Sequence, residues 1–144
     1  MYAAEEERSL LHEKKRTVEC KMNIRATNTI LYCKKWQECV VFYRDKLSFP
    51  VNFENDWFVE FYLRNGSYLS IANEERATIK SSKGKGITIT LCVNDCHESW
   101  EQLTAYGIMP ENVNNNPWGG KSFFFYDPEG NRLEVWSAAN ESTF

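Results

Sequence analysis

The stretch Ser122–Trp136, SFFFYDPEGNRLEVW, predicts a β-hairpin near the C-terminal end of the chain. Its first aromatic residues favour a strand, and the sequence DPEGN at 127–131 follows directly as a turn. Proline presets φ at the second position of a type I turn, Asp127 can accept hydrogen bonds from the turn backbone, and Gly130 can take a positive φ without steric cost. The stretch therefore predicts two antiparallel strands joined by a type I turn with a glycine bulge.

Glu134 lies in the middle of the second strand, between Leu133 and Val135. Charged residues are rarely buried unless they are paired, so the simpler interpretation is a side chain that faces solvent. The other interpretation is a carboxylate placed for function. The choice between them depends on which face of the hairpin carries Glu134.

The composition restricts the class of protein. A chain of 144 residues is one domain with room for a core, and an aromatic content of 15% argues against disorder. The formal net charge of −3 provides no basic field for nucleic acid or an anionic membrane. No apolar run approaches the roughly 20 residues that span a bilayer, and the charged N-terminal segment does not resemble a signal peptide. We expect a cytoplasmic protein whose partners are neither nucleic acid nor membrane.

The five cysteines are an odd number and lack the spacing of a zinc motif. We interpret them as free thiols of a reducing compartment. Cys92, Cys96 and His97 are close in sequence, but Cys92 falls in a strand pattern and Cys96 begins a helix. These three residues are therefore not expected to form a metal site.

The chain divides into an N-terminal extension at 1–25, rich in charge, and a single domain at 26–140. Within the domain we expect a first module at about 26–78 and a second at about 86–138. The first module is predicted to contain a strand at 28–34, a helix at 36–47, and strands at 49–53, 57–63 and 68–72. The second is predicted to contain a strand at 87–93, a helix between the N-cap Asp95 and Gly107, an irregular loop at 111–120, and the hairpin.

The two modules are related by sequence offset. A shift of 60 residues places NTILYC at 28–33 on TITLCV at 88–93, and a shift of 64 places YLRNG at 62–66 on YDPEG at 126–130. A bulged turn adds one residue and reverses which side chains share a face. Tyr62, Tyr68 and Ser70 are then expected on one face. The predicted class is α+β, with two βαβββ modules.

Two such modules, with FYRDKLSF at 42–49 and PWGGKSFFFYDPEGNRLEVW at 117–136, resemble the vicinal oxygen chelate superfamily. The resemblance is greatest to the glyoxalase, bleomycin-resistance and dioxygenase-like proteins and covers about Ile24 to Ser137. It implies a cupped, partly open mixed β-sheet barrel with helices outside and a metal or ligand inside. It also implies a homodimer, sometimes with modules paired across chains. Because this scaffold hosts many reactions, the resemblance does not specify one.

In metal-dependent members, the resemblance implies His, Glu or Gln ligands on the first and last strands of each module. The matching positions here are Asn28, Ser70, Thr88 and Glu134. Only Glu134 is an ordinary ligand for a hard or borderline divalent ion, and the two histidines, His12 and His97, lie outside the cup pattern. We therefore expect no metal or other cofactor. The main reason to expect lyase, isomerase or ring-cleaving chemistry is then absent.

The remaining cup positions predict a wall of aromatic rings and carboxylates, which suits a flat or cationic organic molecule. A structural alternative is that the rings only fill a small barrel and that Arg132 pairs with Glu134 on the same face. Glu134 is the candidate catalytic residue. The predicted ligand-binding residues are Asn28, Tyr32, Phe58, Glu60, Tyr62, Tyr68, Ser70, Thr88, Trp118, Phe124, Tyr126, Arg132 and Trp136.

Three classes of function remain open. The favoured one is a metal-free binder of a small organic molecule, for sequestration, resistance or sensing. The alternative is a glyoxalase- or dioxygenase-like lyase, isomerase or oxidoreductase that uses a metal, or that uses Glu134 as a general base with Glu60 or Tyr126 assisting. The third is a partner-binding module, which predicts no ligand-sized cavity. A small-molecule ligand and a second copy of the chain are the expected partners.

Overall fold

The computed structural model describes residues 21–139, so the predicted N-terminal extension lies almost entirely outside the described residues. The first module comprises β1 (Thr27–Cys33), α2 (Trp36–Val41), the π-helix η1 (Phe42–Lys46), β2 (Val51–Glu54), β3 (Phe58–Arg64), β4 (Ser67–Asn73) and the 3₁₀ turn η2 (Glu74–Arg76). The second comprises β5 (Thr88–Cys92), α3 (Cys96–Ala105), β6 (Asn114–Asn115), β7 (Lys121–Tyr126) and β8 (Arg132–Ser137). No helix within residues 21–139 has the length and apolar character needed to cross a membrane.

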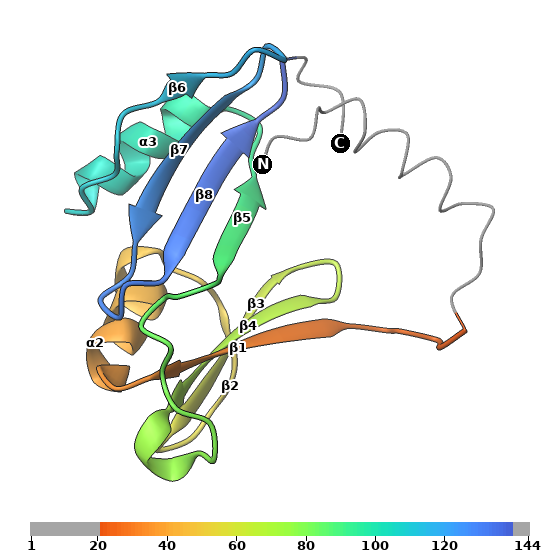
Figure 1. The fold of residues 1–144 in the computed structure, drawn as a ribbon, viewed down its shortest axis with the longest axis vertical. Helices are drawn as coiled ribbons and strands as arrows, with labels where there is room; N and C mark the ends of the chain where they lie inside the picture. The colour runs from red at the N-terminus through yellow and green to blue at the C-terminus, as the bar shows by residue number, and fades with distance from the viewer. Residues whose placement is uncertain (1–20, 140–144) are drawn as a thin grey trace.

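The strands form two mixed sheets with the same topology. Their orders are β1-β4-β3-β2 and β5-β8-β7-β6. The pairs β1–β4 and β5–β8 are parallel, and the other neighbours are antiparallel. The sheets are not hydrogen-bonded to each other, and Figure 1 shows them diverging from the place where α2 meets the β7–β8 turn. The predicted α+β fold of two βαβββ modules is confirmed, and it is open rather than closed into a barrel.

Two local predictions need correction. The helix predicted at 36–47 is α-helical only to Val41, and its last turn is π-helical, with Leu47 N donating to Phe42 O at 3.0 Å. The loop predicted as irregular at 111–120 contains β6, which pairs Asn114 with Ser122. An unpaired edge of β7 would leave backbone groups without partners, and even two residues of strand satisfy part of it. The composition of residues 111–120 favoured a loop, because composition does not show that the segment lies along the edge of β7.

The side-chain facing of both hairpins follows the bulged register. Tyr62 lies opposite Tyr68, Glu60 lies opposite Ser70, and the register shifts between Tyr62 and Arg64 as predicted. In the second module Phe124 lies opposite Glu134, and Tyr126 lies opposite Arg132. We call the face of each sheet that carries these residues the cup face. The opposite faces carry the buried side chains Val59, Phe61, Leu69, Ile71, Phe123, Phe125, Leu133 and Val135.

The segment formed by α2 and η1 packs between the two modules and joins their cores. Tyr43 contacts Phe61 of the first sheet, with ring centroids 6.1 Å apart. Its neighbour Phe42 contacts Phe125 of the second sheet, also at 6.1 Å. Both α2–η1 rings are buried. The aromatic core therefore continues from one sheet to the other, although no strand pairs across.

The turn at 127–131, here called the junction turn, fastens the second module to the first. Asp127 Oδ2 accepts a hydrogen bond from Tyr43 Oη at 2.6 Å. Glu129 accepts from the backbone N–H groups of Lys34 and Lys35 at 3.0 and 2.8 Å, and from Ser81 Oγ at 2.5 Å. Lys35 provides no side-chain cap for α2, so a carboxylate from the distant module supplies the acceptor at this helix start.

The linker before β5 lies directly against the junction turn. Gly84 has φ of +82°, and a Cβ at this position would lie 2.1 Å from Gly130 O. Gly130 itself has φ of +94° and faces Lys83 O. Only glycine permits both this backbone conformation and this approach, so the two glycines allow the linker and turn to pack together.

Acidification is expected to weaken the junction because the pKa of Glu129 is lowered in the folded protein. Burial raises that pKa, but hydrogen bonds from Ser81 and from the N–H groups of Lys34 and Lys35 outweigh it. A carboxyl with a depressed folded pKa stabilises the fold above its ordinary value of 4.5, and the contribution is lost as pH falls through the folded value. We expect Glu129→Gln to flatten the fall in melting temperature below about pH 4.5.

The measurement is thermal unfolding by circular dichroism at a series of acidic pH values. Glu101→Gln, on the exposed side of α3, is the matched control. Its melting temperature should fall with decreasing pH as steeply as that of the parent. If the melting temperature falls equally steeply with decreasing pH in Glu129→Gln and in the parent, the hydrogen bonds of Glu129 do not stabilise the folded chain over the unfolded chain.

Candidate functional site

The cup face of the first module carries a polar network that includes three predicted residues. Ser70 Oγ donates to Asn28 Oδ1 at 2.8 Å, and Asn28 Nδ2 donates to Glu60 Oε1 at 3.2 Å. Asn52 Nδ2 completes the network by donating to Glu60 Oε2 at 2.7 Å. Asn52 was not predicted, because the register irregularity between Val51 and Phe53 brings it to this position and the sequence gives no sign of it.

Aromatic side chains surround this network and form an open wall. Tyr62 contacts Tyr68 at 5.5 Å between ring centroids. Phe58 contacts two rings that were not predicted, Phe53 at 6.5 Å and Trp57 at 5.6 Å. Tyr62 is 38% exposed and Phe53 is 52% exposed, whereas Tyr32 is half-buried. The wall therefore presents apolar area to solvent on the side where the resemblance placed a ligand.

Glu134 is the central residue on the cup face of the second module. Its side chain is 2% exposed, and its Oε2 atom is buried without a hydrogen-bond partner. Its neighbours in register are Thr90 on β5 and Phe124 on β7. A carboxylate in such surroundings costs several kcal/mol unless a partner compensates for the lost hydration. The structure thus places Glu134 inside the protein and not on a solvated strand face.

An ion pair between Arg132 and Glu134, the structural alternative considered from the sequence, is not formed among the described residues. The ion pairs within that part of the chain are Arg44–Asp45 and Arg76–Asp56. Arg132 Nε instead donates to Thr88 Oγ1 at 2.9 Å, and the guanidinium carbon lies 4.5 Å from the ring centroid of Phe124. Alternate residues of a strand stand about 6.6–6.8 Å apart, so sharing a face does not by itself bring two charges together.

Trp118, one of the predicted ligand-binding residues, lies against the cup face of the second module. Its ring meets Trp136 edge to face, with centroids 6.1 Å apart. The ring also covers Gly120, where an added Cβ would fall 1.5 Å from it. Hydrogen bonds from Asn116 N to Gly120 O and from Gly119 N to Asn116 O hold the loop in this turn. Gly120 therefore sets the position of Trp118 beside Trp136.

A cavity of about 410 Å³ opens beside the cup face of the second module. Its volume falls within the range of small-molecule pockets. Tyr126, at its edge, is 49% exposed. The lining residues are Gly84, Gly86, Ile87, Thr88, Tyr126, Gly130 and Arg132, of which three belong to the predicted set.

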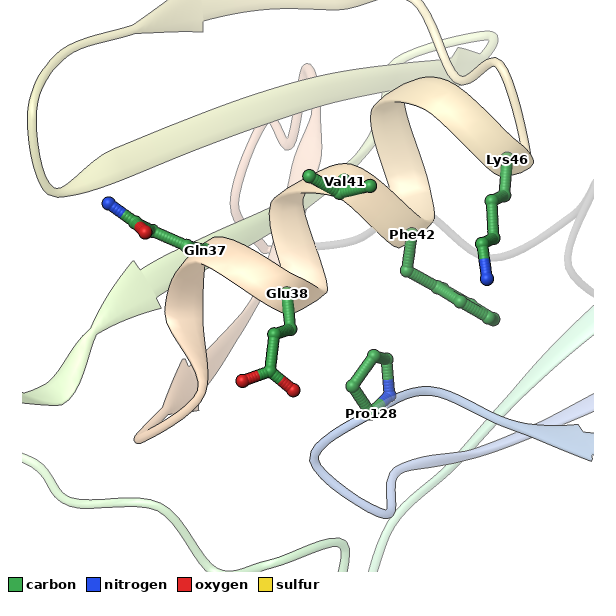
Figure 2. Close-up of a pocket in the computed structure, with 6 residues that line it drawn as sticks. All are labelled: Gln37, Glu38, Val41, Phe42, Lys46 and Pro128. Atoms are coloured by element: carbon green, nitrogen blue, oxygen red, sulfur yellow. The ribbon is translucent and has the colours of Figure 1, made fainter.

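A second hollow of about 410 Å³ lies elsewhere, between α2–η1 and the junction turn. Figure 2 shows Glu38, Phe42 and Lys46 extending from the helix on the side of Pro128. The lining residues are Gln37, Glu38, Val41, Phe42, Lys46 and Pro128. None of them belongs to the cup face, so this hollow is not part of the candidate site.

The positions that hold a metal in related folds do not fit one here. Asn28 and Ser70 are hydrogen-bonded to each other. Thr88 accepts from Arg132, which brings a guanidinium to that position. Glu134 is then the single strong donor of the set, whereas divalent ions require several carboxylate, imidazole or thiolate ligands. These four positions therefore do not form a set of ligands suited to a divalent ion.

The predicted residues thus gather in two groups, one on each sheet. On the cup faces, the hydrogen bonds and ring contacts described above each stay within a single module. Asn28, Glu60 and Ser70 form the network of the first group, and Glu134 lies with Phe124 in the second. The candidate site is therefore two half-walls, the first open and polar at its centre and the second more closely packed around Glu134.

Comparisons with known proteins agree with this architecture. A family model described as a glyoxalase-like domain matches residues 26–140. Lactoylglutathione lyase from Agrobacterium tumefaciens has a similar structure, with a TM-score of 0.67 and 18% identity over 83% of this chain and 97% of that one. A glyoxalase/bleomycin resistance protein/dioxygenase from Nocardioides gives a TM-score of 0.67 and 19% identity over 91% and 93%. A comparison with curated protein sequences gave no match.

A third similar structure is a bleomycin resistance determinant encoded on the transposon Tn5. It has a TM-score of 0.64 and 17% identity over 81% of this chain and all of that chain (100%). Fold and paired modules define a protein of the vicinal oxygen chelate superfamily. Within that superfamily, the chain belongs to the glyoxalase-like domain family.

Proposed function

We propose that the protein binds a small, flat organic molecule carrying a positive charge, and that it does so without a metal. The observation that supports this most strongly is the buried Oε2 atom of Glu134, which has no hydrogen-bond partner. A cationic ligand would supply that partner and compensate for the buried charge. The role that fits such binding is sequestration, resistance or sensing.

The rings beside Glu134 suit the same kind of ligand. Aromatic faces attract cations within about 6 Å of the ring centroid, and more strongly when water is excluded. Arg132 already lies over Phe124 at 4.5 Å, so this face accommodates a cationic group above a ring. Trp136, two residues after Glu134 on β8, is buried and offers a further ring. Rings and carboxylate together select for a flat cation over a neutral ring.

We also propose that a second copy of the chain closes the site. The sheets of one chain diverge, and the aromatic wall of the first module remains open, with Phe53 and Tyr62 exposed. A ligand on one half-wall would leave much of its surface in water, whereas small-molecule sites bury most of it. A homodimer that apposes unlike modules would supply the missing half.

The test is calorimetric titration with quaternary aromatic cations, each paired with its uncharged ring analogue. We expect the cation to bind more tightly than its analogue in the parent. Glu134→Gln should weaken cation binding by at least about 10-fold, roughly 1.4 kcal/mol, with little effect on the analogue. Glu101→Gln is the control for a change of net charge. Equal affinity for cation and analogue, or an unchanged cation affinity in Glu134→Gln, would overturn the proposal.

A further inference from the structure

Two buried thiols and a carboxylate meet at the junction between the modules. Cys33 ends β1, Cys39 lies on α2, and Glu129 belongs to the junction turn. Each offers one donor atom, and the three donor atoms lie within 4.8 Å of one another. Both cysteines are fully buried and Glu129 is 9% exposed. Sequence spacing gave no sign of this group, because five residues separate the cysteines and Glu129 lies 90 residues beyond Cys39.

We propose that Cys33, Cys39 and Glu129 bind a thiophilic divalent cation such as Zn²⁺ or Cd²⁺. Ligands in a tetrahedral zinc site stand ~2.0–2.3 Å from the metal, which places them ~3.3–3.8 Å from one another. The observed group is near this spacing without any ion. Two thiolates with one carboxylate form a donor set typical of zinc and of softer divalent ions.

Glu129 keeps acceptor capacity toward the cluster. Its Oε2 atom accepts from Lys34 N and Ser81 Oγ, whereas Oε1 accepts only from Lys35 N. A carboxylate offers about four lone-pair positions, so one remains on Oε1. The existing bonds would orient the carboxylate as outer partners orient metal ligands in proteins. Glu129 can therefore offer Oε1 to a metal in addition to the hydrogen bonds that hold the junction turn.

The electrostatics of the cluster favour a cation. Asp127, which is also buried, lies close enough for its charge to act on Cys33. The hydrogen bond with Cys39, burial, and the nearby acidic groups all raise the pKa of Cys33 well above its ordinary value. Binding of one M²⁺ by both thiols releases two protons. The metal would bind both thiols of the first module to the turn of the second.

The test uses the full reduced chain and Cd²⁺, whose thiolate complexes show an ultraviolet charge-transfer band. We expect this band to saturate at one equivalent and the melting temperature to rise by several degrees. Cys33→Ser and Cys39→Ser should each abolish the band, and Glu129→Gln should weaken Cd²⁺ binding by about 10-fold. Cys92→Ser, at an exposed thiol on β5, and Glu134→Gln, in the cup, should leave it unchanged.

A second measurement avoids variants that fail to fold. Because Cys33 and Cys39 are fully buried, thiol alkylation of the parent is carried out in a moderate concentration of urea and followed peptide by peptide by mass spectrometry. Cd²⁺ should slow the alkylation of Cys33 and Cys39, while Cys92 reacts as before. The proposal is overturned if no charge-transfer band develops. It is equally overturned if Cd²⁺ protects Cys92 or Cys96 but not the pair at the junction.

Discussion

Asp127→Ala is expected to lower the free energy of unfolding by about 3–5 kcal/mol, because it leaves several buried donors without an acceptor. Oδ1 of Asp127 accepts from the N–H groups of Glu129 and Asn131, each at 2.9 Å. Oδ2 accepts from Asn131 Nδ2 at 2.9 Å and from Tyr43 Oη at 2.6 Å. Alanine removes all four bonds at a side chain that is 5% exposed, and water cannot replace them without opening the junction.

The loss should extend beyond the turn. Tyr43 lies in the shared aromatic core, and the turn also positions Glu129 at the start of α2. Asp127→Ala therefore weakens the contact between modules as well as the hairpin. Urea denaturation followed by circular dichroism measures the effect. Asp127→Asn, which keeps an acceptor oxygen, should lose less.

Asp56→Ala provides the matched control. Asp56 pairs with Arg76 on the surface at 3.4 Å, and its side chain is 79% exposed. Exposed ion pairs contribute little, so the change should stay within about 0.5 kcal/mol. An unfolding free energy for Asp127→Ala within about 1 kcal/mol of the parent would mean that the junction turn does not depend on its carboxylate.

The facing of the strands was predictable because hairpin register depends on local chemistry. The positions of Gly66 and Gly130 at matching offsets indicated bulged turns in both modules. Once the bulge is assigned, every side chain of the flanking strands is assigned to a face, since the period is two. This is why Glu60 and Glu134 could be placed on the cup faces without a structure.

The roles of Glu129, Cys33 and Cys39 could not be predicted from local sequence. In the sequence, Glu129 has the pattern of an ordinary turn residue. Its hydrogen-bond donors Lys35 and Ser81 lie 94 and 48 residues away along the chain. Such contacts depend on how the modules pack, and neither periodicity nor spacing describes that packing. The partner of Arg132 was left open by the sequence for a related reason, and the structure shows Thr88 in that place. The shared face showed which residues lie near Arg132, but it did not show which of them accepts a hydrogen bond from the guanidinium group.

Glu134→Met is expected to raise the free energy of unfolding by about 1–4 kcal/mol in the absence of ligand. Replacing a buried charged group that has no partner by an apolar side chain of similar volume removes a desolvation penalty and keeps the packing. Glu134 meets both conditions, since it is 2% exposed and its Oε2 atom has no hydrogen-bond partner. The same change removes the carboxylate on which cation binding depends, so stability should increase as affinity decreases.

Glu60→Met is the matched control on the other half-wall. Glu60 accepts hydrogen bonds from Asn28 and Asn52, so its replacement should cost about 0.5–1.5 kcal/mol and provide no gain. Urea denaturation of both variants without ligand, and again with a saturating aromatic cation, separates the two effects. The ligand should stabilise the parent and Glu60→Met more than Glu134→Met. If Glu134→Met is destabilised as much as Glu60→Met, then the Glu134 carboxylate is already compensated in the empty protein. The principal support for cation binding would be lost with it.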